Sequence, residues 1–194
     1  MLSNHAGLAI NTVETERNTG PLSLHGIIDA CIRGERQAQH QLYQQFFNSL
    51  FAICLRYASD HDEARSLVNQ AFLKAFQALE QCKDVQAFPA WINRIAVNTC
   101  LDHIRKLKSK QTMALEDAPE PAIPSSALDK LEAEDLLKLV QQLPPINRAV
   151  FSLYVVEGYK HEEIAQELGM SVGTSRWHLS TAKKALKNLL QNYY

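Results

Sequence analysis

The segment from residue 143 to residue 189 constrains the fold most, because it holds three helical patterns separated by short breaks. Pro144 and Pro145 stand where a first helix would open, since proline suits the first turn. Apolar residues follow at helical spacing, namely Ile146, Val150, Leu153 and Tyr154. Gly158 ends this pattern. A second, short pattern carries acids in its first turn and apolar residues on one face, namely Glu162, Glu163, Ile164, Ala165 and Leu168.

The break before the third pattern has the residues of a tight turn between helices. Gly169 can adopt the left-handed conformation that ends a helix, and Ser171 is a good N-cap for the next one. A helix, a short turn containing glycine and a second helix form the helix-turn-helix motif. The sequence therefore predicts this motif near the C-terminal end.

The third pattern has the charge and polarity of a DNA-reading helix. Residues 171–194 contain four Lys or Arg and no acid, and such a field suits phosphate binding. In this motif the N-terminal part of the second helix enters the major groove. The candidate DNA-contacting residues are Ser171, Thr174, Ser175, Arg176, Trp177, His178, Lys183 and Lys184. A solvated helix face or a protein-docking module is the alternative, and the turn residues favour DNA.

Charge is distributed unevenly along a chain of 194 residues whose net charge is only −1. Residues 103–115 carry four cations and no acid, whereas residues 116–137 carry seven acids and one lysine. The length suits one large or two small domains. A protein that binds nucleic acid by bulk charge is excluded, so any DNA contact must be local.

The cysteines Cys31, Cys54, Cys82 and Cys100 are widely spaced in apolar helical patterns, which predicts reduced packing residues. Cys100 and His103 could share a helix turn, but no second ligand pair is evident, so we expect neither a metal nor another cofactor. No apolar run is long enough to span a membrane, and the N-terminus lacks the layout of a signal peptide. We expect a cytoplasmic protein without membrane insertion.

The remaining chain reads as helices without any strand alternation, so the predicted class is all-α. Helices are expected at about 24–33 and 35–59, then after a cap at Asp60 or Asp62, and finally from Pro89 to about residue 110. The predicted plan is a flexible tail, a helical domain, a flexible acidic linker and a small helix-turn-helix domain, with the bounds 1–21, 22–110, 111–126 and 127–194.

The helix from Pro89 carries a second informative face. Its residues at intervals of four, three, four and three are Trp91, Ile95, Asn98, Asp102 and Arg105, and Lys106 adds to the basic end. An amide and an arginine beside aromatic side chains could hold an unstacked base. In the alternative interpretation Trp91 is a core residue and Asp102 forms an intrahelical pair with Arg105.

Both halves together resemble the small extracytoplasmic-function (ECF) sigma factors of bacterial RNA polymerase. The segment DHDEARSLVNQAFLKAFQAL, followed by FPAWINRIAVNTCLDHIRK, is similar to the family's second domain, and residues 143–186 are similar to its fourth. The resemblance covers about residues 24–190.

The resemblance implies partners and roles for the residues above. The helix around Ser66, Leu67, Asn69 and Gln70 would bind the β′ clamp helices of core RNA polymerase. The face with Trp91, Asn98, Asp102, Arg105 and Lys106 would melt the −10 element of promoter DNA. The helix-turn-helix would read the −35 element and contact the β flap. An anti-sigma factor is a further partner that the family implies.

Two departures from the family pattern affect these roles. Ser66, Asn69 and Gln70 stand where the family usually has an acid, a glutamine and an acid. Arg176, Trp177 and His178 replace a frequent pair of basic residues around a serine, and Thr181 stands where arginine is common. The −35 preference of relatives is therefore not transferable.

Two other functions stay open, and a third is not expected. A stand-alone regulator would bind DNA without polymerase, and an adaptor would keep the folds without promoter activity. An enzyme is not expected: His161 and Glu162 resemble the start of a zinc-protease HExxH motif, but Ala165 occupies the second histidine position.

Overall fold

The computed structural model describes residues 23–110 and 133–191, with backbone alone at residues 108–110 and 133–134. Every regular element in these two ranges is helical, which confirms the all-α class. The helices are α1 (Leu24–Ile32), α2 (Arg36–Leu55), α3 (His61–Gln77), η1 (Leu79–Gln81), α4 (Phe88–Lys110), α5 (Ala133–Gln141), α6 (Pro145–Phe151), η3 (Ser152–Val156), α7 (His161–Leu168) and α8 (Val172–Gln191). The predicted tail 1–21, linker 111–126 and helix start at 127 lie outside the described residues.

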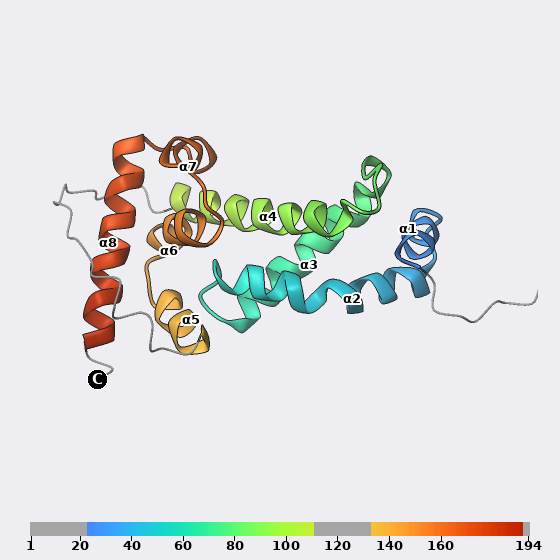
Figure 1. Ribbon diagram of the computed structural model, residues 1–194, viewed down its shortest axis with the longest axis horizontal. Coiled ribbons are helices and arrows are strands. Elements are labelled where there is room, and N and C mark those ends of the chain that lie inside the picture. Colours follow the sequence, from blue (N-terminus) through green and yellow to red (C-terminus); the bar gives the residue numbers. More distant parts are fainter. Residues whose placement is uncertain (1–22, 111–132, 192–194) are drawn as a thin grey trace, which may run out of the picture.

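The first four α-helices form the N-terminal unit, in which α2 and α4 run in the same direction and α3 crosses between them (Figure 1). α2 ends at Leu55, four residues before the predicted end, because the chain must turn there to reach the cap of α3. That cap is Asp60, whose carboxylate accepts a hydrogen bond from the Glu63 backbone N–H at 2.8 Å. The choice between Asp60 and Asp62 is thereby settled.

The C-terminal unit begins its second helix with Pro145 at the first position, as predicted. α6 then widens into a π-helical turn, η3, in which the backbone N–H of Glu157 bonds to the carbonyl of Ser152. A π-helical turn holds one residue more than an α-helical turn, so the residues of η3 point in directions that differ from those of a regular α-helix. Val150 and Leu153 are buried, whereas Tyr154, which was expected on the same face, is 40% exposed.

The two units pack directly against each other. α6 and α7 lie beside the C-terminal half of α4, and α5 lies near the end of α2 (Figure 1). The buried apolar residues of both units form one contiguous cluster, from Ile27 to Leu190. The sequence predicted two tethered domains, and the structure adds an interface between them.

The cysteines are free thiols, and Cys31, Cys54 and Cys100 are buried. The sulfur atoms of Cys54 and Cys100 lie 3.7 Å apart, which is a packing contact between α2 and α4. Burial raises the pKa of the Cys31 thiol to about 11, with the nearby Glu35 carboxylate adding to the effect. These thiols therefore act as packing residues, as the sequence predicted. No helix among residues 23–110 and 133–191 is long and apolar enough to cross a membrane.

Candidate nucleic-acid interface

The candidate −10 face runs along α4 from Trp91 to Lys106. Asn98 and Lys106 are exposed, whereas Trp91 is half-buried and packs on Phe88 with ring centroids 5.5 Å apart. Trp91 thus belongs mainly to the edge of the core, as the alternative interpretation expected. The side chains of residues 108–110, which include two lysines of the basic run, lie outside the described residues.

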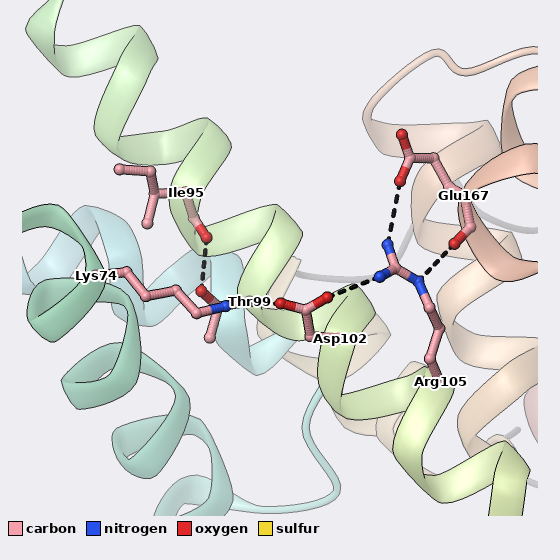
Figure 2. A network of polar contacts seen from close by, with 6 residues as sticks. All are labelled: Lys74, Ile95, Thr99, Asp102, Arg105 and Glu167. Atoms are coloured by element: carbon pink, nitrogen blue, oxygen red, sulfur yellow. Dashed lines mark hydrogen bonds and ion pairs between the residues drawn. The ribbon is translucent and has the colours of Figure 1, made fainter. Parts of the chain in front are cut away.

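Asp102 and Arg105 are the centre of a polar network rather than a simple intrahelical pair (Figure 2). Asp102 accepts from Arg105 Nη1 at 2.7 Å and from Lys74 Nζ of α3 at 2.6 Å. Arg105 also reaches α7, where Nε donates to the Glu167 carbonyl at 2.7 Å and Nη2 lies 3.3 Å from the Glu167 carboxylate. The predicted pair is present, and it continues into the C-terminal unit.

The network holds two cations and two acids, so their charges balance. All four side chains are about half-exposed, and exposed pairs of this kind contribute little stability. A phosphate or a base edge could therefore replace one of the acids at low energetic cost. Arg105 is the residue whose release would free a cation for DNA.

The candidate polymerase-binding face lies on α3. Ser66, Asn69 and Gln70 are exposed, and they are joined to their surroundings by hydrogen bonds from Gln70 Nε2 to Ser66 Oγ at 3.3 Å and from the Tyr43 hydroxyl to Asn69 Oδ1 at 3.0 Å. Leu67 is buried in the core, so it supports this face without forming part of its surface. The three exposed side chains, Ser66, Asn69 and Gln70, are polar and uncharged.

The turn between α7 and α8 has the geometry of a helix-turn-helix. Gly169 lies in the left-handed region with φ of 58°, and its N–H closes the end of α7. Ser171 caps α8 by accepting from the Thr174 N–H at 3.0 Å, and the two side-chain oxygens lie 2.8 Å apart. Both local predictions are confirmed, and this geometry defines the C-terminal unit as a helix-turn-helix.

The predicted −35 residues fall into an exposed and a buried group. Arg176 and Lys184 are exposed, and Arg176 lies 4.0 Å from Glu162 of α7. Lys183 is half-buried, with its ammonium 5.9 Å from the centre of the Tyr154 ring. The exposed cations form a surface that an anionic ligand can reach.

Ser175 and His178 belong to the interior of the motif. Ser175 Oγ lies 2.9 Å from His161 Nδ1, and His178 Nδ1 lies 2.7 Å from Asn147 Oδ1 of α6. Both side chains are at most 5% exposed. Trp177 is half-buried beside His178, and its indole Nε1 is buried without a hydrogen-bond partner among the described residues. We therefore leave Ser175 and His178 out of the DNA surface proposed below.

The end of α2 forms a junction between the two units that the sequence did not reveal. Three carbonyl groups at or just past its C-terminus accept hydrogen bonds from side chains of the C-terminal unit. The pairs are Gln141 Nε2 with the Leu55 carbonyl at 3.3 Å, Ser152 Oγ with the Arg56 carbonyl at 3.0 Å, and Arg148 Nε with the Tyr57 carbonyl at 3.0 Å. Arg148 Nη1 also donates to the Gln141 carbonyl at 2.7 Å.

Two charged groups complete this junction. Arg148 is only 2% exposed, and burial lowers the pKa of its guanidinium, although nearby Glu63 and Asp60 oppose the shift. Arg56 Nη2 lies 2.6 Å from the Glu157 carboxylate, which follows η3. The only sequence signal was the four-residue spacing of Arg148 and Ser152, which is compatible with one helix face, whereas Gln141 ends the preceding helix.

Comparison with known proteins identifies both units. A family model for Sigma-70 region 2 matches residues 42–110, and one for Sigma-70, region 4 matches residues 133–186. RNA polymerase sigma-H factor of Pseudomonas aeruginosa is 30% identical over 182 residues, covering 85% of this chain and 92% of that protein. ECF RNA polymerase sigma-E factor of Escherichia coli K12 is 26% identical over 182 residues, covering 85% and 93%.

A solved structure of the sigma factor RpoE in complex with the anti-sigma factor NepR from Bartonella quintana is 23% identical to this chain, with a TM-score of 0.47. It covers 78% of this chain and 96% of that one. On the family matches and the sequence relatives, the chain belongs to the sigma-70 family of RNA polymerase sigma factors, in its extracytoplasmic-function group. Sigma factors are transcription initiation factors, so the family supports the expectation of a non-catalytic chain.

Proposed function

We propose that this sigma factor directs RNA polymerase to promoters through two DNA-contacting surfaces, one on each helical unit. The observation that carries the proposal is the placement of exposed cations at both expected positions, with Arg105 and Lys106 on α4 and Arg176 and Lys184 on α8. Because the net charge is −1, this local placement must supply the attraction for phosphate.

The −35 element is read by the first turns of α8. The Ser171 cap orients the start of this helix, and Arg176 stands on its exposed side, where it can donate two hydrogen bonds to a guanine edge. Glu162, 4.0 Å away, is an exposed acid that Arg176 can leave at little cost. Lys184 and Lys183 follow along the helix and contact phosphates.

The −10 element is opened by the face of α4 that runs from Trp91 to Lys106. Arg105 and Lys106 hold the phosphate backbone, and Asn98 offers its exposed amide to the edge of an unstacked base. Trp91 supports this face from the edge of the core, and Asp102 orients Arg105 across one helix turn. Unstacking costs a few kcal/mol per base step, so the base and phosphate contacts must offset that cost together.

Core RNA polymerase is bound by the exposed face of α3, at Ser66, Asn69 and Gln70, against the β′ clamp helices. Because these side chains are uncharged, the contact rests on hydrogen bonds and on the neighbouring Leu73, which is 59% exposed. Its affinity should therefore depend weakly on salt, in contrast to a contact made by acids. The C-terminal unit contacts the β flap, and an anti-sigma factor is a further partner to which we assign no residues.

Transcription in vitro with core polymerase over genomic DNA tests the proposal. The purified chain should produce transcripts from a selected set of start sites, and a uniform start-site distribution equal to that of core polymerase alone would refute it. Start-site selection separates the sigma factor from the adaptor, which would bind polymerase without selecting start sites. A DNA-binding assay without polymerase identifies the stand-alone regulator, which would bind its DNA alone.

Reversing Arg105 and Lys106 to glutamate separates the two roles of the N-terminal unit. Permanganate reactivity of the −10 region should disappear, because two phosphate contacts become repulsive, while binding to core polymerase stays within about twofold. Arg36→Glu, a charge reversal of an exposed arginine at the start of α2, is the control. Loss of core binding in the double variant would show that α4, rather than α3, docks on the polymerase.

A further inference from the structure

An open cavity of about 620 Å³ lies between the two units, bounded by α2, the first half of α4 and the segment that follows η3. This volume falls in the range of sites that bind small organic molecules, roughly 300–1,000 Å³. Residues four positions apart line the cavity from each long helix, so each helix presents one face to it. They are Ser49 and Ile53 on α2, and Asn93 and Val97 on α4.

The cavity is separate from the surfaces assigned above to DNA and to polymerase. At the ~100° per residue of an α-helix, the face of α4 that lines the cavity points roughly 110° away from the face with Asn98 and Asp102. None of the residues that line the cavity belongs to the proposed −10, −35 or polymerase-binding sets. A molecule bound here would therefore be an additional ligand.

The side chains that line the cavity carry an excess of positive charge. Arg94 is exposed, and its guanidinium has no ion pair or hydrogen bond within the part of the chain that the structure describes. Arg56 Nη2 lies 2.6 Å from the carboxylate of Glu157, which is the one acid among the lining residues. Two arginines against one acid leave a net charge of +1. Ala90 lies in the first turn of α4, where the helix dipole adds positive potential, so the cavity favours an anion.

Two of the lining residues each hold a buried polar atom that lacks a hydrogen-bond partner in residues 23–107 and 135–191, namely Arg56 Nε and Asn93 Oδ1. Most buried polar atoms in folded proteins are paired, because leaving one unpaired costs stability. Nε is a donor and Oδ1 is an acceptor. The terminal torsion of an asparagine turns at low cost, so a hydroxyl or amino group in the cavity can donate to Asn93.

The same cavity has an apolar wall. Ile53 and Val97 line it and are 8% and 6% exposed, and the half-buried Tyr159 lies at the side of the C-terminal unit. Small-molecule sites combine such apolar surface with a few placed polar groups. A bare inorganic ion would leave this wall unused, whereas an organic anion would cover it.

We propose that this cavity binds a small organic anion, a molecule in which a phosphate or carboxylate group is joined to an apolar or aromatic body that carries a hydrogen-bond donor. Arg94 contacts the oxyanion and Arg56 adds positive charge, because a guanidinium binds either group through two parallel hydrogen bonds. Asn93 accepts from the donor, and the apolar wall contacts the body. Since the cavity is lined by both units, the bound molecule stabilises the folded chain by mass action.

Titration calorimetry and thermal unfolding of the full chain test the site with four probes. Adenosine 5′-monophosphate and indole-3-acetate represent the phosphate and carboxylate forms, and adenosine and inorganic phosphate each lack one half of the proposed ligand. At least one of the two organic anions should bind at one site per chain with a Kd below roughly 1 mM and raise the unfolding temperature. Tighter binding of the monophosphate assigns the site to phosphates, and tighter binding of indole-3-acetate assigns it to carboxylates. The half-ligands should bind at least about tenfold more weakly, because each loses the charged or the apolar contact.

Three variants locate the bound probe. Arg94→Gln should weaken its binding about tenfold or more, whereas Arg176→Gln, the same change at an exposed arginine of α8, should leave it unchanged. Asn93→Leu removes the unpaired acceptor, so it should raise the unfolding temperature of the free chain while weakening the probe about threefold or more. A residue with a merely structural role would not produce this opposite pair of effects.

Several results would overturn the site. Absence of binding by both organic anions up to about 10 mM would do so, since a matched cavity of this size should exceed such a weak affinity. Equal binding of adenosine and its monophosphate would remove the role of the arginines. An equal loss of binding in Arg176→Gln and Arg94→Gln would mean that the anion only occupies cations scattered over the surface. Start-site selection is measured without any probe, so the proposed function stands or fails separately.

Discussion

Arg148 should contribute about 2–3 kcal/mol to the free energy of unfolding, measured as the loss caused by Arg148→Met. Its guanidinium is 2% exposed and donates to the carbonyls of Tyr57 and Gln141 at 3.0 and 2.7 Å. Hydrogen bonds to a charged group contribute roughly 1.5–3 kcal/mol each, or about 3–6 kcal/mol for both. Replacement by methionine offsets part of this loss, because no buried charge then has to be desolvated and the methionine side chain fills most of the space.

Urea unfolding followed by circular dichroism measures this loss, with Arg36→Met as the matched control. Arg36 is exposed on α2, so its replacement should change stability by less than about 0.5 kcal/mol. Arg148→Lys keeps the positive charge but replaces the planar guanidinium with an ammonium group, so it should reduce the free energy of unfolding roughly half as much as Arg148→Met does. Because the Tyr57 carbonyl lies in one unit and the Gln141 carbonyl in the other, Arg148→Met should also broaden the transition or split it in two.

Equal stability of Arg148→Met and Arg36→Met, within about 0.5 kcal/mol, would refute the reasoning. It would mean that the hydrogen bonds of the buried guanidinium only balance the cost of burying it. A large loss with an unchanged single transition would be a different result. Arg148 would then stabilise the C-terminal unit through Gln141 alone, without joining the two units.

Three further predictions concern single residues. Burial alone would raise the pKa of Glu63, but hydrogen bonds from Ser59 and His103, together with the electrostatic attraction of His103, lower this pKa below its ordinary value of 4.5. The ionised Glu63 therefore stabilises the fold above pH 4.5, and this contribution is lost as the pH falls. Glu63→Gln should flatten the acid limb of a stability–pH profile and reduce the free energy of unfolding by about 1 kcal/mol at pH 7. Gly169→Ala should cost about 1 kcal/mol in thermal unfolding, since φ is 58° and an added Cβ meets no atom within 4 Å, and a neutral result would show that the turn relaxes. Arg176→Ala should weaken binding to the −35 element in the holoenzyme footprint by ~1–3 kcal/mol, and an unchanged footprint would exclude a base contact.

Local features of the fold were predictable from sequence because the groups that determine them lie within four residues of each other. The Ser171 cap contacts the N–H three residues later, and the Asp60 cap does the same. Gly169 needs only its own backbone freedom to end α7. The helix-turn-helix could therefore be predicted from its turn.

The position of side chains around a helix was less predictable, because one extra residue in a turn changes the face. Tyr154 fits the apolar period of α6, but the π-helical turn at residues 152–156 carries it to the surface. Ser175 and His178 lie where a DNA-reading helix would have contacts, yet α6 and α7 supply polar partners that draw both inward. Their partners are 14 and 31 residues away, beyond any local pattern.

The interface between the units was not predictable, and its chemistry explains why. Arg148 pairs with a carbonyl 91 residues away, and a carbonyl group is the same in every residue type. A sequence shows which side chains can donate but not which backbone oxygen will be left without a partner. An arginine on a short helix in a DNA-binding unit would ordinarily be assigned to phosphate contact, and only its burial shows that it holds the units together.

The pairing of cations with acids bears on how a chain with a net charge of −1 would contact DNA. Arg105 lies 3.3 Å from the Glu167 carboxylate and Arg176 lies 4.0 Å from that of Glu162, so both arginines of the proposed DNA surfaces face an acid of α7. Exposed pairs of this kind contribute little stability, so a phosphate group can replace the acid at low cost. A chain with a permanent excess of positive charge would bind DNA non-specifically. Pairing of these arginines with acids would therefore lower non-specific attraction while leaving the proposed promoter contacts available.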